Sequence, residues 1–139
     1  MSVEYPFVAH LGIERRMSEA GVSEVVLAPL PEHLNSFGVV HGGVLMTLLD
    51  VAMAAAARSL QAGMGVVTIE MKTSFLRPAR GLLSGAGRVV QRGATLCFAE
   101  ASVSDAAGRE CARASGTFKY VRRQSAPARL PADAVALGD

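Results

Sequence analysis

The segment HGGVLMTLLDVAMAAAA, residues 41–57, constrains the fold more than any other part of the chain. Two glycines are followed by leucine, methionine and alanine at helical spacing, with alanine at most of the remaining positions. A helix that is apolar on nearly every side has to be covered by the rest of the molecule. The spacing predicts a helix from His41 to about Gln61, buried on most sides and ended by the AGMG segment at 62–65.

Asp50 is the one charged side chain in this apolar run, and it falls near the middle. An isolated ionised carboxylate in an apolar core costs several kcal/mol unless it is paired or hydrogen-bonded. Two explanations are open. In the structural one, Asp50 bonds Thr47 one turn back or caps a neighbouring strand; in the other, it belongs to a functional site.

The start of the predicted helix favours a functional site. Gly42 and Gly43 leave backbone N–H groups at the helix N-terminus with almost no side chain to block approach. The helix dipole adds partial positive charge at this end, which suits a developing oxyanion. The alternative explanation for the glycine pair is a tight connection from loop to helix that packs against the sheet.

Helical geometry separates the two candidate groups. Gly42 and Asp50 are eight residues apart, which is about 12 Å along one helix. Two groups that act on one carbonyl must both lie within about 3–4 Å of it. If both are catalytic, Asp50 of one subunit must face Gly42 of another, so the sequence predicts a homodimer with two-fold symmetry.

The segments around the helix predict an α+β protein in which an antiparallel sheet wraps the helix. The opening YPFVAHLGI predicts one or two helical turns that cover the core, and a β-hairpin turning at Gly21 follows. In VVTIEMKTSFLRP, residues Val67, Ile69, Met71 and Phe75 alternate with polar residues, which predicts a half-buried strand. Two long strands that turn at Gly93, and then the segment RECARASGTFKYV, complete a set of antiparallel neighbours.

Length and composition limit the class of protein. With 139 residues the chain has room for one domain, predicted over residues 1–121, and the Ala/Pro-rich residues 122–139 predict a flexible tail. A net charge of +2 from scattered arginines and an aromatic content of 5% argue against nucleic acid as a partner. We expect a cytoplasmic protein without membrane span, metal or cofactor, because no signal peptide, long uncharged run or metal-ligand spacing is found.

The motif residues resemble a known family. HLNSFGVVHGGVLMTLLDVAMAAAA followed by VVTIEMKTSFLRPAR closely resembles the PaaI-like branch of the hotdog-fold acyl-CoA thioesterases, over residues 10–121. The family pattern of Asn, HGG six residues later and an acid nine residues after the His is met by Asn35, His41–Gly43 and Asp50. The resemblance implies a long antiparallel sheet around one helix, and paired subunits that build two active sites.

The resemblance also implies roles for the matching residues. The acid at Asp50 would attack the thioester or activate the water that does, and the Gly42 N–H of the partner chain would polarise the carbonyl. Asn35 and His41 would hold the carbonyl and the start of the helix, and Thr68 would orient the water. Each has a structural alternative: an Asx-turn for Asn35, capping for His41 and ordinary strand propensity for Thr68.

One position departs from part of the family. Members that use Glu as the acid often carry a Thr one turn later, where this chain has Ala54. The branch that uses Asp is therefore the better match.

The resemblance further implies where substrate binds. It implies that arginines near strand ends receive the nucleotide phosphates of coenzyme A and that helix methionines, with Gly43 and the N-terminal segment, line the acyl site. The matching residues are Arg77, Arg80, Arg92, Met46 and Met53. Surface arginines are often only solvated, and methionine at helical spacing is often core.

These observations predict a thioesterase that hydrolyses an aromatic or a medium- or long-chain acyl-CoA, assembled as a homodimer and further as a homotetramer. The alternative is a non-catalytic hotdog module that binds acyl-CoA as a sensor or carrier, which would be expected to lack Asp50. A hotdog dehydratase is a third option, but the Asp/His pairing expected for it is absent near this helix.

Overall fold

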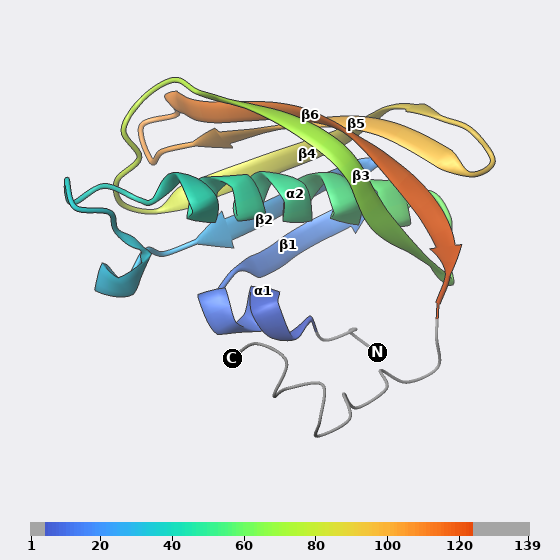
Figure 1. Cartoon of the computed structure of the whole chain (residues 1–139), viewed down its shortest axis with the longest axis horizontal. Coiled ribbons are helices and arrows are strands. Elements are labelled where there is room, and N and C mark those ends of the chain that lie inside the picture. The colour runs from blue at the N-terminus through green and yellow to red at the C-terminus, as the bar shows by residue number, and fades with distance from the viewer. Residues whose placement is uncertain (1–4, 124–139) are drawn as a thin grey trace, which may run out of the picture.

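The computed structural model describes residues 5–123 and contains one long helix held by one sheet (Figure 1). The elements in chain order are α1 Pro6–Leu11, β1 Glu14–Glu19, β2 Val22–Leu27, the short 3₁₀ helix η1 Pro31–His33, α2 Gly42–Arg58, β3 Met64–Phe75, β4 Leu83–Arg92, β5 Leu96–Ser104 and β6 Glu110–Arg122. The predicted opening turns, hairpin, long helix and later strands are thus confirmed. Apart from residues 122 and 123, the predicted tail lies outside the described residues.

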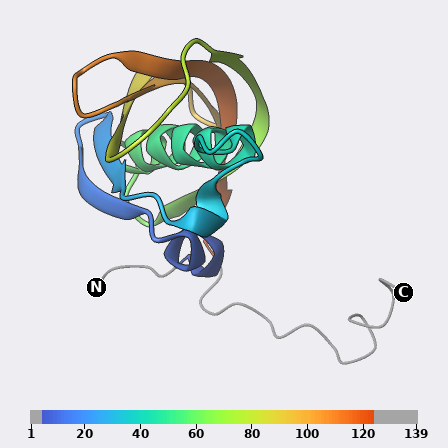
Figure 2. The ribbon, with the colours of Figure 1, turned by 90° about the vertical axis from the view of Figure 1, so that its left-hand side faces the viewer.

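All six strands form one antiparallel sheet in the order β1-β2-β4-β5-β6-β3. The sheet curls around α2, and α1 lies on the side that the sheet leaves open (Figure 2). This arrangement confirms the α+β hotdog fold. The strand after the helix, β3, pairs with β6 rather than with β4, so β1 and β3 are the two edge strands. No helix among residues 5–123 is long and apolar enough to cross a membrane.

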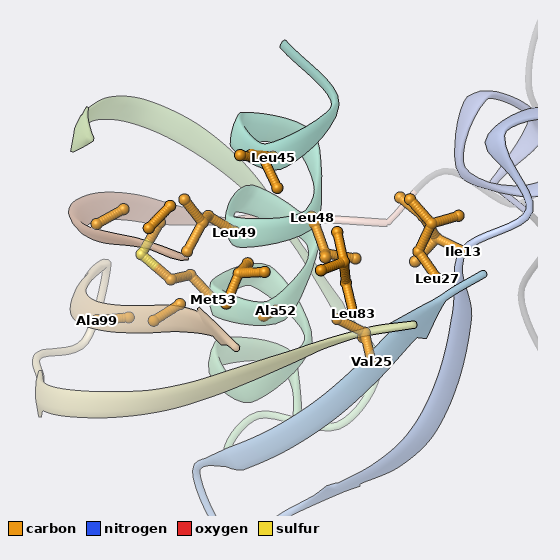
Figure 3. Close-up of a cluster of buried hydrophobic side chains, with 14 of the residues drawn as sticks. Ile13, Val25, Leu27, Leu45, Leu48, Leu49, Ala52, Met53, Leu83 and Ala99 are labelled. Atoms are coloured by element: carbon orange, nitrogen blue, oxygen red, sulfur yellow. The ribbon is translucent and has the colours of Figure 1, made fainter. Parts of the chain in front are cut away.

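The core lies between one face of α2 and the concave side of the sheet (Figure 3). Leu48, Leu49, Ala52 and Met53 of α2 are fully buried there. The opposite face of α2 is different, because Met46 is 39% exposed and Asp50 is only half-buried. The prediction that α2 is buried on most sides is confirmed, since Gly43 and Met46 are the exposed residues of the helix; the sheet covers one side, and α1 covers part of the other.

Small residues let α2 lie close to the sheet. A Cβ added to Gly87 of β4 would lie 2.3 Å from the carbonyl oxygen of Ala52. That carbonyl also accepts a hydrogen bond of 2.6 Å from the Ser23 hydroxyl, and the Tyr120 hydroxyl donates to the Ala57 carbonyl at 2.7 Å. Backbone contact and hydroxyl bonds therefore fix the position of α2 along the sheet.

The edge strand β3 contains a bulge that changes the predicted alternation. Its pairing with β6 shifts between Thr68 and Glu70, so one extra residue, Ile69, is inserted there. Thr68 and Met71 face the helix side, while Val67 and Ile69 are 46% and 54% exposed. The prediction that Val67 and Ile69 lie on the buried side of a half-buried strand is wrong, because no neighbour among residues 5–123 covers them at this edge of the sheet.

The close approach at Gly87 gives a direct test of the packing. Gly87→Ala is expected to lower the free energy of unfolding by at least about 2 kcal/mol, because the added methyl group meets helix backbone that cannot rotate away. Urea unfolding at fixed protein concentration measures the change. Gly93→Ala is the matched control, because a Cβ there meets its nearest atom at 3.6 Å. Equal stability of the two variants would contradict the close packing.

Candidate active site

The start of α2 is organised by His41, which is the N-cap residue. Its Nδ1 accepts a hydrogen bond of 2.9 Å from the Gly43 N–H. The His41 N–H donates to the His33 carbonyl at 2.8 Å and ties the helix start to η1. The structure therefore gives His41 the capping role that the sequence analysis left open, and Gly43 donates to that cap.

Asn35 shapes the loop that precedes the helix. Its side-chain oxygen accepts from the N–H groups of Phe37 at 2.9 Å and Val39 at 3.3 Å, which is an Asx-turn. An isolated bridge between Leu34 and Val40 closes the same loop. The side-chain oxygen is thus used within the loop, and the amide nitrogen is the part of Asn35 that can donate to a ligand.

Gly42 is the first residue of α2 and has no intrahelical acceptor for its N–H. Within residues 5–123 no hydrogen bond from this group is formed. The Phe75 ring lies beside it, since a Cβ at Gly42 would approach the ring at 3.3 Å. The helix start therefore offers one available N–H next to an aromatic wall.

Asp50 is bonded by the neighbouring strand rather than by its own helix. The Thr68 hydroxyl of β3 donates to Asp50 Oδ1 at 2.6 Å. Thr47 instead donates to the Gly43 carbonyl at 2.8 Å. The pairing of Asp50 with Thr47 considered from sequence is therefore wrong, and the two residues singled out as acid and water-orienting group are in direct contact.

A pocket of about 300 Å³ opens beside this carboxylate. Phe7 and Val8 of α1, Met46 and Val51 of α2, and Met71 of β3 supply an apolar lining, and Asp50, Thr47 and Thr68 supply the polar groups. Met46 and the N-terminal segment, which the sequence analysis assigned to the acyl site, both line this pocket, and their role in binding stays a prediction. Met53 does not, because it is fully buried in the core on the other face of α2.

The predicted site residues form two separate groups within one chain. Asn35, His41, Gly42 and Gly43 gather at the start of α2, and Asp50 and Thr68 meet about 12 Å further along the helix. Within one chain, the residues at the start of α2 lie close to one another, and so do Asp50 and Thr68, but the two groups lie apart.

The three arginines predicted near coenzyme A also do not converge within one chain. Arg77 donates to the Glu110 carbonyl at 2.8 Å, and Arg92 donates to the Leu60 carbonyl just after the end of α2. Arg80 is exposed in the loop that pairs with Val40 near the start of α2. Arg77 and Arg80 therefore lie at one end of the helix and Arg92 at the other, and their roles stay predictions.

Several lining residues carried no signal of their own in the sequence. Val8, Val51 and Met71 resemble ordinary core positions. Val8 lines the pocket because α1 lies across the open side of the sheet, Val51 because it follows Asp50 in α2, and Met71 because it faces the helix side of β3 with Thr68. Phe75 was assigned to the buried side of a strand. Its position beside Gly42 depends on where β3 ends relative to α2, which residue spacing does not reveal.

One long helix wrapped by an antiparallel sheet, with a hydrogen-bonded acid half-way along the helix and a glycine pair at its start, is the arrangement expected of a hotdog protein. The model of the thioesterase superfamily matches residues 37–112, which include Asp50, Thr68 and the glycine pair. The chain belongs to the thioesterase superfamily, and its fold is that of the PaaI-like hotdog proteins.

Individual relatives agree with this assignment. A candidate esterase of Halobacterium salinarum is 39% identical over 102 residues, covering 67% of this chain and 68% of the relative. A solved structure from Ralstonia eutropha, described as a candidate thioesterase and a phenylacetic acid degradation-related protein, is 31% identical with a TM-score of 0.77. The match covers 85% of this chain and 92% of its own. The Escherichia coli PaaI protein, from the phenylacetic acid degradation operon, is similar in fold, with 23% identity and a TM-score of 0.79 over 85% of this chain and 86% of its own.

The capping role of His41 can be measured. His41→Ala is expected to lower the free energy of unfolding by about 1 kcal/mol, because the Gly43 N–H loses its acceptor at the helix start. His41→Asn keeps an N-cap acceptor and should recover most of that loss. Urea unfolding of the three proteins at one concentration checks this, and equal stability of wild type and His41→Ala would rule out a capping contribution.

Proposed function

We propose that the protein is an acyl-CoA thioesterase that hydrolyses an aromatic or a medium- or long-chain acyl-CoA to the free acid and coenzyme A. The observation that carries the proposal is the Asp50 carboxylate, bonded to Thr68 at 2.6 Å beside an apolar pocket. The acyl group would enter this pocket, whose lining from Phe7, Met46 and Met71 suits an aromatic ring or an alkyl chain.

Asp50 would be the nucleophile or the general base. The bond from Thr68 occupies Oδ1 and fixes the orientation of the carboxylate, which leaves Oδ2 to face the thioester carbon or an attacking water. When water attacks, one of its protons passes to the carboxylate and later to the leaving thiolate, so that the acid and the free thiol are the products. Thr68 would also hold the water in line.

The oxyanion would be stabilised by a partner subunit. Gly42 has an N–H without an acceptor among the described residues, but it lies too far along α2 to reach a carbonyl held at Asp50 of the same chain. Two features support a dimer across this side. β3 is an edge strand, and its Val67 and Ile69 are about half exposed. Assembly of such dimers into tetramers, and a cytoplasmic location, stay predictions.

The role of Asp50 is tested by Asp50→Asn, which keeps the shape of the side chain and removes its basicity. We expect kcat to fall by about 10³ with fold and assembly retained. Thiol release from a panel of aromatic and aliphatic acyl-CoAs measures the activity. Glu19→Gln, which changes an exposed acid at the end of β1, should keep wild-type activity. Turnover that survives in Asp50→Asn would overturn the mechanism, and wild-type binding without turnover would favour the sensor or carrier.

The sharing of the site between subunits is tested by complementation with Gly42→Pro. Proline is favoured at the first position of a helix and lacks an N–H, and the extended ψ of His41, 140°, suits the residue before a proline. Gly42→Pro and Asp50→Asn should each be inactive alone. After mixing and reassembly, half of the dimers would pair unlike chains with one intact site, which should restore about a quarter of wild-type activity.

Gly42→Ala is the matched control for complementation, because it adds a methyl group near Phe75 but keeps the N–H. It should retain most of the activity. Mixtures that gain no activity, although mixed dimers are detected by native mass spectrometry, would show that a single chain supplies both groups.

A further inference from the structure

A second cavity, of about 480 Å³, lies at the far end of α2 and is lined by four arginines. Arg15, Arg16, Arg58 and Arg123 contribute to its wall together with Tyr5. No Asp or Glu is present among the described residues of the wall. We refer to it as the arginine pocket.

The fold gathers these arginines from three places that are distant in sequence. Arg58 is the last residue of α2, and Arg123 directly follows β6. Arg15 and Arg16 are consecutive in β1, where side chains of neighbouring residues normally point to opposite sides. The pairing of β1 with β2 shifts between Arg15 and Met17, so a bulge there redirects one side chain and lets both arginines line the same cavity.

The charge of this cluster is not neutralised within residues 5–123. The ion pairs in that part of the chain involve Arg88, Arg109 and Arg113 and none of the four. Arg58 lies over the Tyr5 ring at 4.8 Å, and Arg123 donates to the Tyr5 hydroxyl at 3.2 Å. Burial lowers the pKa of Arg58 below its usual range; Tyr5 and Asp50 act to raise that pKa, and the charges of Arg15 and Arg123 act to lower it. Such a cluster is stabilised by an anion.

The arginine pocket and the apolar pocket lie in opposite directions from Asp50. The apolar pocket extends toward Met46, one turn before Asp50 in α2, and toward Met71, which follows Thr68 in β3. The arginine pocket reaches Arg58, two turns after Asp50, and Met64, which precedes Thr68. α1 and the residue before it connect the two, since Phe7 lines one pocket and Tyr5 the other. The side of α2 left open by the sheet thus carries an apolar, an acidic and a cationic site in that order.

We infer that the arginine pocket binds the phosphate groups of the coenzyme A part of the substrate. The inference rests on the proposed thioesterase function. With the acyl group in the apolar pocket and the carbonyl at Asp50, the rest of the thioester extends toward Arg58, and the pantetheine arm is long enough to bridge the two helical turns between them. Guanidinium groups bind phosphate through paired hydrogen bonds, and four of them match a group with several negative charges.

Binding of a phosphate probe tests the pocket directly. Adenosine 3′,5′-bisphosphate, titrated calorimetrically into the assembled protein, should bind the wild type and bind Arg15→Gln/Arg16→Gln and Arg58→Gln at least about tenfold more weakly. Arg109→Gln is the matched control, because Arg109 pairs with Asp105 in the turn between β5 and β6 and contributes nothing to the pocket. Equal affinity of wild type and both pocket variants would overturn the inference.

Kinetics identify the source of the phosphate. The same acyl group is offered on coenzyme A and on N-acetylcysteamine, which carries no phosphate. The pocket variants should raise KM at least about tenfold for the coenzyme A thioester and leave its kcat and the N-acetylcysteamine reaction unchanged. Added salt should raise KM for the coenzyme A thioester alone.

Two other outcomes would overturn the assignment. In the first, the double variant Arg77→Gln/Arg80→Gln raises KM for the coenzyme A thioester and the pocket variants do not. The phosphates would then bind at the other end of α2. If the pocket variants no longer bind the bisphosphate but their KM for the coenzyme A thioester is unchanged, the pocket binds a phosphate ligand other than the substrate. Failure of the proposed function looks different, because the wild type would then hydrolyse neither thioester while bisphosphate binding could still be measured.

Discussion

The packing of one apolar helix against one sheet is the constraint on which the rest of this structure depends. α2 approaches β4 so closely that the Ala52 carbonyl occupies the space of a side chain at Gly87. That contact requires small residues on both elements, which explains the alanine-rich composition of the helix. Because six strands curl around a single helix, the sheet ends before it encloses the helix, and one side of α2 is left for other uses.

The candidate site occupies that remaining side. Its two central residues come from the elements that meet at the opening, Asp50 from α2 and Thr68 from the edge strand β3. A carboxylate placed on the sheet side would have no water and no partner, whereas at the opening it keeps one oxygen for a strand hydroxyl and the other for a ligand. At this position the charge of Asp50 is solvated, and a substrate can reach the carboxylate.

Local sequence patterns were sufficient for much of this description. The start of α2 at the glycine pair, the hairpin and the later strands followed from spacing and turn residues, and the position of Thr68 beside Asp50 followed from the family resemblance. The exposure of Val67 and Ile69 could not be predicted, because it depends on β3 being an edge strand with a bulge. The prediction that Thr47 of the same helix bonds Asp50 was also wrong. The Thr47 hydroxyl instead donates to the Gly43 carbonyl one turn back.

The four arginines were scattered in the sequence and gave no basic segment, yet the fold collects them around Tyr5. Tyr5 and Arg123 stand at the two ends of the described chain and are joined by a hydrogen bond. This bond joins the residue before α1 to the residue after β6, and both side chains are part of the cavity wall. Because the wall is built from both terminal segments of residues 5–123, its electrostatic potential depends on two stretches that are more than a hundred residues apart in the sequence, and a change of charge in either one alters the field that a ligand meets there.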